Sequence, residues 1–254
     1  MNRGLQQVLK RRDNFKTRSL ALNYFIIKPN IRIMRNGLLF FLIVFFYSNL
    51  VEAQNIKVPA IPYPMHFENK VLNYEITGND HIKIVAPGNT DLYIPADGSS
   101  ETNKSPRLLF KPDSDFILTA RISLDFKSQW DAGALLIYND SKHYAKFCFE
   151  RDFKGQPRVV SVVCNEVADD CNSTAIYKNE IFYRITGSTK GNTFGLYYSE
   201  DGKEWSPVRG FKLDKTDNVQ IGFSAQSPTG DKCSVDFTDI DFQEREPTNF
   251  WTGE

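Results

Sequence analysis

The feature that most constrains this chain is a succession of short strand signals along residues 66–245. Eleven runs rich in β-branched or aromatic residues, such as DFILTARISLDF and RVVSVVCN, follow one another at intervals near ten residues. Pro, Gly, Asn and Asp separate them, and no stretch keeps the i, i+3, i+4, i+7 apolar spacing of a helix over three turns. The sequence therefore predicts one all-β domain, a jelly-roll sandwich of two antiparallel sheets.

Two turns in this domain can be placed from their glycines. Asp201-Gly202 stands between aromatic strand ends, and Lys154-Gly155 stands between two long β-rich runs. Glycine readily adopts the positive φ angles that tight hairpins require. We therefore expect a hairpin turn at each of these two dipeptides.

The N-terminal segment has the order of a secretory signal peptide. Arg35 precedes an unbroken apolar run, residues 38–46, and Val51 and Ala53 occupy the −3 and −1 positions of a cleavage site before Gln54. The alternative is a membrane anchor, but nine apolar residues fall short of the roughly 18 that span a bilayer. We expect a secreted, periplasmic or cell-surface protein with no stable membrane insertion after cleavage.

These features divide the chain into four parts, and both Met1 and Met34 are candidate start sites. The parts are residues 1–53 (N-terminal extension plus signal peptide), 54–65 (linker), 66–245 (β-sandwich domain) and 246–254 (C-terminal tail).

Charge is divided unevenly along the chain. The whole sequence has 31 basic and 31 acidic residues, but its first 53 residues hold nine basic and two acidic ones. The remaining 201 residues therefore carry 22 basic and 29 acidic side chains, a formal net charge of −7. Because binding to a phosphate backbone needs clustered Lys and Arg, this distribution argues against nucleic acid as a partner.

Cysteine and histidine spacing indicates no metal site. An exported protein can form disulfides, and four cysteines allow three full pairings, among which the sequence does not choose. A short loop closed by the second and third cysteine is one option. The cysteines are Cys148, Cys164, Cys171 and Cys233. No Cys or His stands at zinc-ligand spacing. We expect no cofactor, with a structural calcium ion bound by the acidic turns PADGSS or VADDCNS as the alternative left open.

The strand predicted at residues 143–150 carries the most informative polar pattern. Alternation places Ala145, Phe147 and Phe149 on one face, which should pack between the sheets. The opposite face then presents a ring, an ammonium group, a thiol and a carboxyl in a row: Tyr144, Lys146, Cys148 and Glu150. In an open groove the Tyr144 ring would stack on a sugar while Lys146 and Glu150 bond its hydroxyls. The alternative is a solvated sheet surface with cross-strand ion pairs.

Three further acidic or aromatic positions are weaker candidates. Asp91 and Tyr93 share one face of a short strand within residues 89–98, and this segment taken alone is better explained as an ordinary edge strand. Asp170 follows Asp169 in what we expect to be a turn, together with Asn172, and acidic turns are usually only solvated. No nucleophile elbow, P-loop, GxGxxG or HExxH motif is present, so no catalytic residue is assigned.

The central block of the chain resembles the DUF1349 family, the YesU-like β-sandwich proteins of the concanavalin A-like lectin/glucanase type. Asp131-Ala132-Gly133 matches the opening of the family pattern, and Lys146 and Glu150 match its Lys and Glu. Tyr144 stands where the family usually has Trp. The hairpin SEDGKEW and the late run IGFSAQSP extend the resemblance over residues 66–243.

The resemblance implies a concanavalin A-like jelly roll and a role near polysaccharides, since that superfamily contains lectins, carbohydrate-binding modules and glycosidases. We expect an exported, non-catalytic, lectin-like protein of polysaccharide recognition or utilisation, with an oligo- or polysaccharide as its partner. One alternative is a glycoside hydrolase in which Glu150 works with a second carboxyl. The other is a structural or adhesive surface domain. The candidate glycan-binding residues are Asp91, Tyr93, Asp131, Tyr144, Lys146, Glu150 and Asp170.

Overall fold

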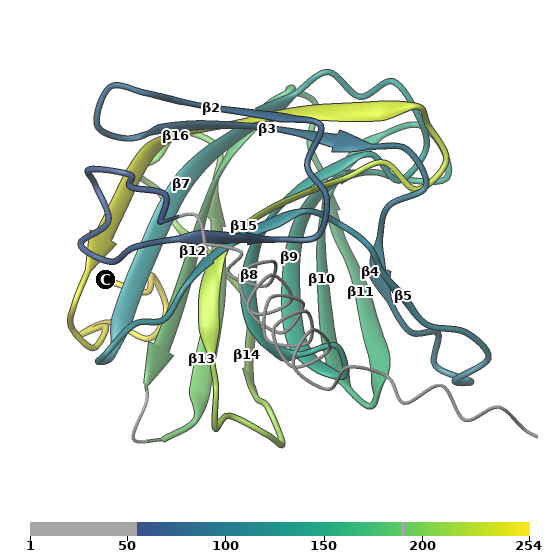
Figure 1. The fold of residues 1–254 in the computed structure, drawn as a ribbon. Coiled ribbons are helices and arrows are strands. Elements are labelled where there is room, and N and C mark those ends of the chain that lie inside the picture. Colours follow the sequence, from purple (N-terminus) through teal and green to yellow (C-terminus); the bar gives the residue numbers. More distant parts are fainter. Residues whose placement is uncertain (1–54, 189–190) are drawn as a thin grey trace, which may run out of the picture. The chain divides into compact units, whose positions relative to one another are not determined.

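Strands alone build the part of the chain that the computed structural model describes, residues 55–188 and 191–254 (Figure 1). The expected signal peptide and cleavage site lie outside these residues. Within them, no helix is long and apolar enough to cross a membrane. The strands are β1 (His66–Glu68), β2 (Asn73–Thr77), β3 (His81–Pro87), β4 (Leu92–Tyr93), β5 (Thr102–Asn103), β6 (Arg107–Phe110), β7 (Phe116–Leu124), β8 (Ala132–Asp140), β9 (His143–Arg151), β10 (Pro157–Asn165), β11 (Val167–Ala175), β12 (Glu180–Ser188), β13 (Thr193–Ser199), β14 (Ser206–Lys212), β15 (Gln220–Gln226) and β16 (Lys232–Gln243).

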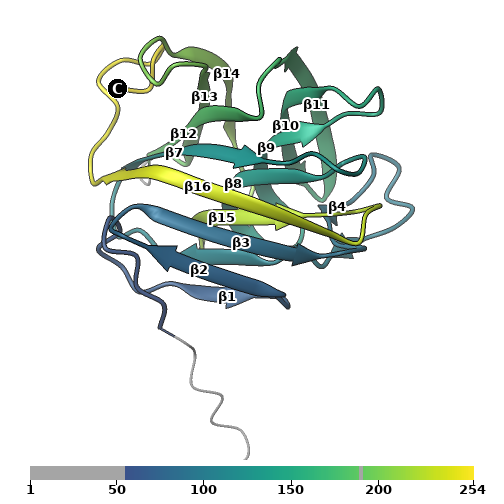
Figure 2. The same ribbon diagram turned by 90° about the horizontal axis from the view of Figure 1, so that it is seen from above.

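The strands form two seven-stranded antiparallel sheets and one small pair. The first sheet has the order β1-β6-β15-β8-β9-β10-β11, the second sheet has the order β14-β13-β12-β7-β16-β3-β2, and β4 pairs with β5. Figure 2 shows β7, β16, β3 and β2 following one another across the second sheet. The two sheets pack face to face, which confirms the predicted all-β sandwich of two antiparallel sheets.

The core lies between the two sheets and follows the predicted alternation on β9. Ala145, Phe147 and Phe149 are buried there, as expected, and the Phe147 ring stacks on Tyr183 with centroids 3.8 Å apart. Gly133 on β8 explains why a glycine stands in the Asp-Ala-Gly motif. A Cβ atom at this position would lie 2.4 Å from a methyl group of Val235, so only glycine lets the two sheets approach this closely.

Both predicted hairpin turns are confirmed. Gly202 has a φ angle of 75° between β13 and β14, and Gly155 has a φ angle of 80° between β9 and β10. Each turn is also fixed by an aspartate that accepts backbone hydrogen bonds. Asp201 accepts from the N–H groups of Lys203 and Glu204, and Asp152 accepts from those of residues 154 and 156.

The stretch expected to be a linker instead belongs to the core. Ile56, Val58 and Ile61 are buried, and Ile56 pairs with the buried Met65 in an isolated bridge. Proline prevents these residues from forming a regular strand, but it does not prevent their apolar side chains from packing on the sandwich. The C-terminal tail is likewise held in place, because the carbonyl oxygen of Phe250 accepts a hydrogen bond from the Tyr197 hydroxyl on β13.

All four cysteines are free thiols, so the short disulfide-closed loop left open by the sequence does not form. Cys164 on β10 faces Ala168 across the β10–β11 hairpin, whereas Cys171 faces Ser161 three residues further along. This register keeps the two sulfur-bearing residues apart. Cys148, Cys164 and Cys233 are buried and Cys171 is exposed.

Removing the stacked ring at the centre of the core should destabilise the fold strongly. We expect Phe147→Ala to lower the free energy of unfolding by about 3–5 kcal/mol, because it leaves a cavity beside Tyr183. Tyr177→Ala is the matched control, since Tyr177 is 86% exposed and its loss should cost less than about 0.5 kcal/mol. Denaturant titration followed by circular dichroism measures both, and an unchanged midpoint for Phe147→Ala would contradict the assigned core.

Thiol counting checks the cysteine assignment. In the native protein only Cys171 should react rapidly with an aromatic disulfide reagent, because the other three thiols are buried. After denaturation without reductant, four thiols should react. Fewer than four would reveal a disulfide.

Candidate functional site

A loop segment covers much of the outer face of the first sheet. This cover segment, residues 88–105, includes β4 and β5 and lies beside β11 (Figure 1). The N–H of Ala168 on β11 donates to the carbonyl oxygen of Ile94 (2.8 Å). Leu92 and Ile94 pack into an apolar cluster on the sheet surface. The outer face is therefore largely a second, smaller core.

The cover segment overturns the expected role of Tyr144. The side chain does project from the predicted face of β9, but it is fully buried, and its hydroxyl donates to the carbonyl oxygen of Leu92 (3.2 Å). Burial raises the pKa of this phenol well above its usual range. Tyr144 therefore fastens the cover segment to the sheet, and the prediction that its ring is an open stacking surface is wrong.

A buried ion pair fixes the same segment two residues further along β9. The Lys146 ammonium group is 3% exposed and donates to Asp91 (2.8 Å) and to the side-chain oxygen of Gln226 (3.0 Å). Although burial disfavours the ammonium ion, the Asp91 carboxylate keeps the pKa of Lys146 above its ordinary value. The Asp91 carboxylate also accepts from the N–H of Leu92, and the main-chain carbonyl oxygen of Asp91 accepts from the N–H groups of residues 104 and 105, so Asp91 joins the two ends of the cover segment.

Beside this ion pair lies a cavity of about 310 Å³, which we call the Trp130 pocket. Val160 and Val162 on β10 contribute its apolar lining. The complete lining is Asp91, Tyr93, Trp130, Lys146, Glu150, Val160, Val162, Asp170, Asn172 and Gln226. Five of the seven residues nominated from the sequence therefore come together here. The two nominated residues outside the lining are Tyr144 and Asp131.

Asp131 has a supporting role. Its carboxylate is fully buried, accepts from the N–H groups of Lys127 and Ser128, and accepts from the Ser227 hydroxyl (2.7 Å). These bonds fix the loop between β7 and β8 that carries Trp130. The expectation that Asp131 contacts a glycan directly does not fit this burial; it positions its neighbour instead.

Two partly exposed aromatic side chains, Trp130 and Tyr93, line the pocket. Trp130 has a φ angle of 68°, which a bulky residue rarely adopts. Its N–H donates to the carbonyl oxygen of Arg151 (2.8 Å), and its carbonyl oxygen accepts from Gln226 (3.2 Å). Sequence reasoning missed Trp130, whose only signal was its place immediately before the family motif.

Glu150 is an almost fully buried carboxyl that faces the pocket, with 8% of its surface exposed. Burial raises its pKa to about 8, the Lys146 ammonium opposes this shift, and the nearby Asp91 and Asp170 carboxylates reinforce it. Gln226 is its hydrogen-bond partner, at the long distance of 3.5 Å. At neutral pH Glu150 is therefore mainly a neutral acid whose O–H can donate to a ligand.

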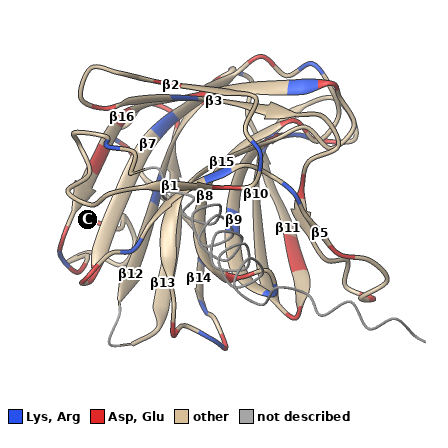
Figure 3. Cartoon of the chain, in the orientation of Figure 1, with Lys and Arg blue, Asp and Glu red and all other residues tan. Residues whose placement is uncertain are grey.

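Asp170 and Asn172 lie on strand β11, which corrects the expected acidic turn. The turn comes earlier, at Glu166, where the φ angle is 69°. β11 is an edge strand of the first sheet, and the red stretch on its ribbon in Figure 3 marks acidic residues. Asp170 accepts a hydrogen bond from the Tyr93 hydroxyl, and burial together with this carboxylate raises the pKa of Tyr93 to about 12.

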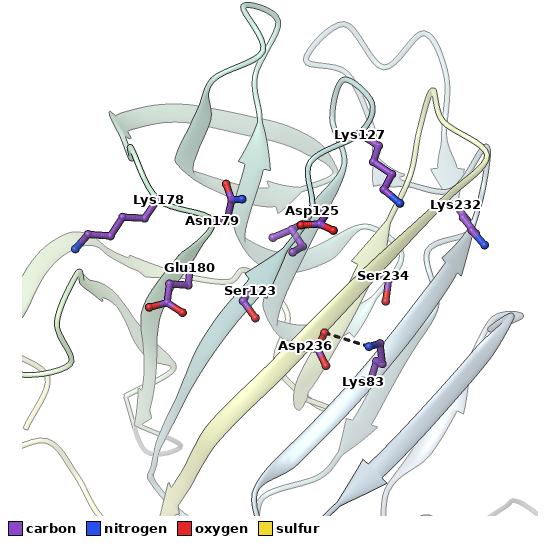
Figure 4. Close-up of a pocket in the computed structure, with 11 residues that line it drawn as sticks. Lys83, Ser123, Asp125, Lys127, Lys178, Asn179, Glu180, Lys232, Ser234 and Asp236 are labelled. Carbon is purple, nitrogen blue, oxygen red and sulfur yellow. Dashed lines mark ion pairs between the residues drawn. The ribbon is translucent and has the colours of Figure 1, made fainter.

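A second hollow, of about 530 Å³, lies on the outer face of the second sheet (Figure 4). Its lining is polar apart from Leu124, with Lys83 and Asp236 joined in an ion pair at 3.5 Å. None of the described residues that line it is aromatic. In residues 55–188 and 191–254 no group of three or more His, Cys, Asp or Glu side chains can hold a metal ion. The Trp130 pocket is therefore the stronger candidate site.

Solved structures share this fold at low sequence identity. A functionally unknown protein from Saccharomyces cerevisiae superimposes with a TM-score of 0.65 and 18% identity, covering 71% of this chain and 96% of the yeast chain. A xylan β-1,4-xylosidase from Bacillus halodurans C-125 gives a TM-score of 0.53 and 15% identity, covering 65% of this chain and 33% of the enzyme. Bacteroides ovatus xyloglucan PUL GH43B gives a TM-score of 0.52 and 16% identity, covering 65% of this chain and 33% of that protein.

These likenesses establish the fold alone, and the chain spans about a third of the two bacterial proteins. No curated protein matches the chain in sequence. The family described as "Protein of unknown function (DUF1349)" matches residues 67–245, which is most of the chain and includes every residue that lines the Trp130 pocket. The chain is a member of the DUF1349 family.

Proposed function

We propose that this protein binds carbohydrate, without cleaving it, in the Trp130 pocket. The observation that carries the proposal is the combination of two aromatic rings with amide and carboxyl groups in one cavity of about 310 Å³. A sugar ring has apolar C–H faces and a polar rim of hydroxyls, so it needs this mixture of surfaces.

The polar lining is well suited to hydroxyl recognition because it offers both donors and acceptors. The Asn172 and Gln226 amides have donor and acceptor atoms, and the Asp170 carboxylate accepts. The neutral Glu150 carboxyl supplies an O–H donor that an ionised carboxylate would lack. The Lys146 ammonium, paired with Asp91, also donates to Gln226 and so holds this amide in place.

The bacterial structures with the same fold agree with a carbohydrate ligand. Their descriptions name a xylosidase and a xyloglucan-related GH43 protein. We further propose that this protein acts outside the cytoplasm, since residues 38–46 have the pattern of a signal-peptide core. The role then resembles that of a lectin or of a binding module in polysaccharide utilisation.

One observation favours a glycoside hydrolase as the second candidate. Glu150 is held neutral near two carboxylates, and a protonated carboxyl beside an ionised one is the arrangement of a glycosidase acid and its partner. However, Asp91 is bound by the Lys146 ammonium and Asp170 by the Tyr93 hydroxyl, so neither carboxylate is unoccupied. We therefore favour binding. Release of reducing ends from a polysaccharide that the protein binds, abolished in Glu150→Gln, would establish the hydrolase instead.

Removing the pocket indole should weaken binding without unfolding the protein. We expect Trp130→Ala to lower affinity for a bound oligosaccharide about thirtyfold, since truncating an aromatic anchor in a binding site costs about 2 kcal/mol. Trp251→Ala is the matched control, because Trp251 is 69% exposed and lies outside the pocket. A glycan array identifies the oligosaccharide and calorimetry measures both variants. Equal affinities for wild type and Trp130→Ala would place the site elsewhere.

Burial of Glu150 should make stability fall as pH rises. The folded protein holds this proton up to about pH 8, whereas an ordinary Glu carboxyl loses it near 4.5. Because the folded-state pKa is raised, the stability is full below about pH 4.5 and is lost as the pH rises through about 8. Relative to Glu150→Gln, wild-type unfolding free energy should therefore decrease across this range and then level off. Parallel pH-dependent denaturation curves for the two proteins would contradict the buried, neutral carboxyl.

A further inference from the structure

The charges that line the Trp130 pocket are unequally available to a ligand. Its one lysine, Lys146, is 3% exposed and already donates to Asp91 and Gln226 at 2.8 and 3.0 Å. The Lys146–Asp91 pair is therefore electrically neutral and internally satisfied. Asp170 is different, because it is exposed on β11 and, in the part of the chain that the structure describes, its carboxylate is bonded only by the uncharged Tyr93 hydroxyl.

No second cation compensates for Asp170 among the described lining residues. Arg158 stands opposite Glu150 in the β9–β10 pairing, but its guanidinium is bonded to Asp152 (3.0 Å) and to the carbonyl oxygen of Ser173 (2.7 Å). The lining thus carries one uncompensated negative charge when Glu150 is neutral, and two when Glu150 is ionised.

An acidic sugar would meet this lining without a cation to pair with. Its carboxylate or sulfate would lose hydration, gain no charge-assisted bond and be repelled by Asp170. A neutral sugar has no such penalty and can use the same oxygens as acceptors for its hydroxyls. We infer, on the basis of the function proposed above, that the pocket selects uncharged sugar residues and rejects uronic acids and sulfated sugars.

Glu150 should strengthen this selection at alkaline pH. The titratable and charged groups around it are Lys146 and Cys148 on β9, Arg158 opposite it on β10, Asp91 in the cover segment, Asp170 on β11, Asp152 after β9 and, from the inner core, Tyr183 on β12. The cations among these described groups are Lys146 and Arg158, and each is already paired, Lys146 with Asp91 and Arg158 with Asp152. Because the pKa of Glu150 is about 8, raising the pH from 6.5 to 9 adds a second negative charge beside the ligand.

Matched pairs of neutral and acidic oligosaccharides test the inference. Cellotetraose, mannotetraose and galactotetraose are each compared with the tetrasaccharide of the corresponding uronic acid, by calorimetry at pH 6.5 and low salt. At least one neutral member should bind, and its uronate partner should bind at least tenfold more weakly. At pH 9 the ratio should widen for wild type and stay constant for Glu150→Gln.

Variants on β11 separate the charge effect from general damage. Asp170→Asn should bring the neutral-to-uronate affinity ratio toward one, because it removes the exposed carboxylate while keeping a similar shape. Asp169→Asn is the matched control, since Asp169 is paired with Arg209 and does not line the pocket, and it should leave the ratio unchanged.

The possible failures are distinguishable. If a uronate binds as tightly as its neutral partner and Trp130→Ala abolishes both interactions, the inferred preference for uncharged sugars is wrong. The proposed sugar binding in the Trp130 pocket is then still supported. If no member of the panel binds, or if Trp130→Ala binds like wild type, the proposed function itself is wrong, and the selectivity falls with it.

Discussion

The Trp130 pocket depends on the buried ion pair between Lys146 and Asp91. An ammonium group that is 3% exposed is tolerated only with a close carboxylate and further hydrogen bonds, which Asp91 and Gln226 provide. Asp91 in turn holds the backbone at both ends of the cover segment. Without this pair one charge would stay buried alone, and the cover segment that carries Tyr93 would lose one of its attachments to the sheet, beside those made by Tyr144 and Ala168.

The sequence correctly predicted the features that depend only on the alternation of side chains along one strand. Ala145, Phe147 and Phe149 face the inner core because neighbouring side chains on a strand point to opposite faces, whatever the rest of the chain does. The fate of Tyr144 on the other face depended on Leu92, which is 52 residues away in sequence and lies over it. Alternation shows that two faces differ, but it does not show what covers the second one.

The candidate site was predicted in part for the same reason. Lys146 and Glu150 share a strand, so their common face was predictable, whereas Trp130 reaches the pocket through an unusual backbone angle and a bond from Gln226 on a distant strand. Asp170 was predicted to lie in a turn because most residues around it are of types that are uncommon in β-strands, such as Asp and Asn. An edge strand tolerates such residues, since one side of it faces water.

The backbone of Trp130 is tied on both sides, to the carbonyl oxygen of Arg151 and to the Gln226 amide. The indole is therefore attached to a main chain whose direction is set before any ligand arrives. A sugar that stacked on the indole would restrict little further motion of the protein. The protein would therefore lose little conformational entropy on binding. Such a preorganised surface favours recognition of a single ring geometry over adaptation to many.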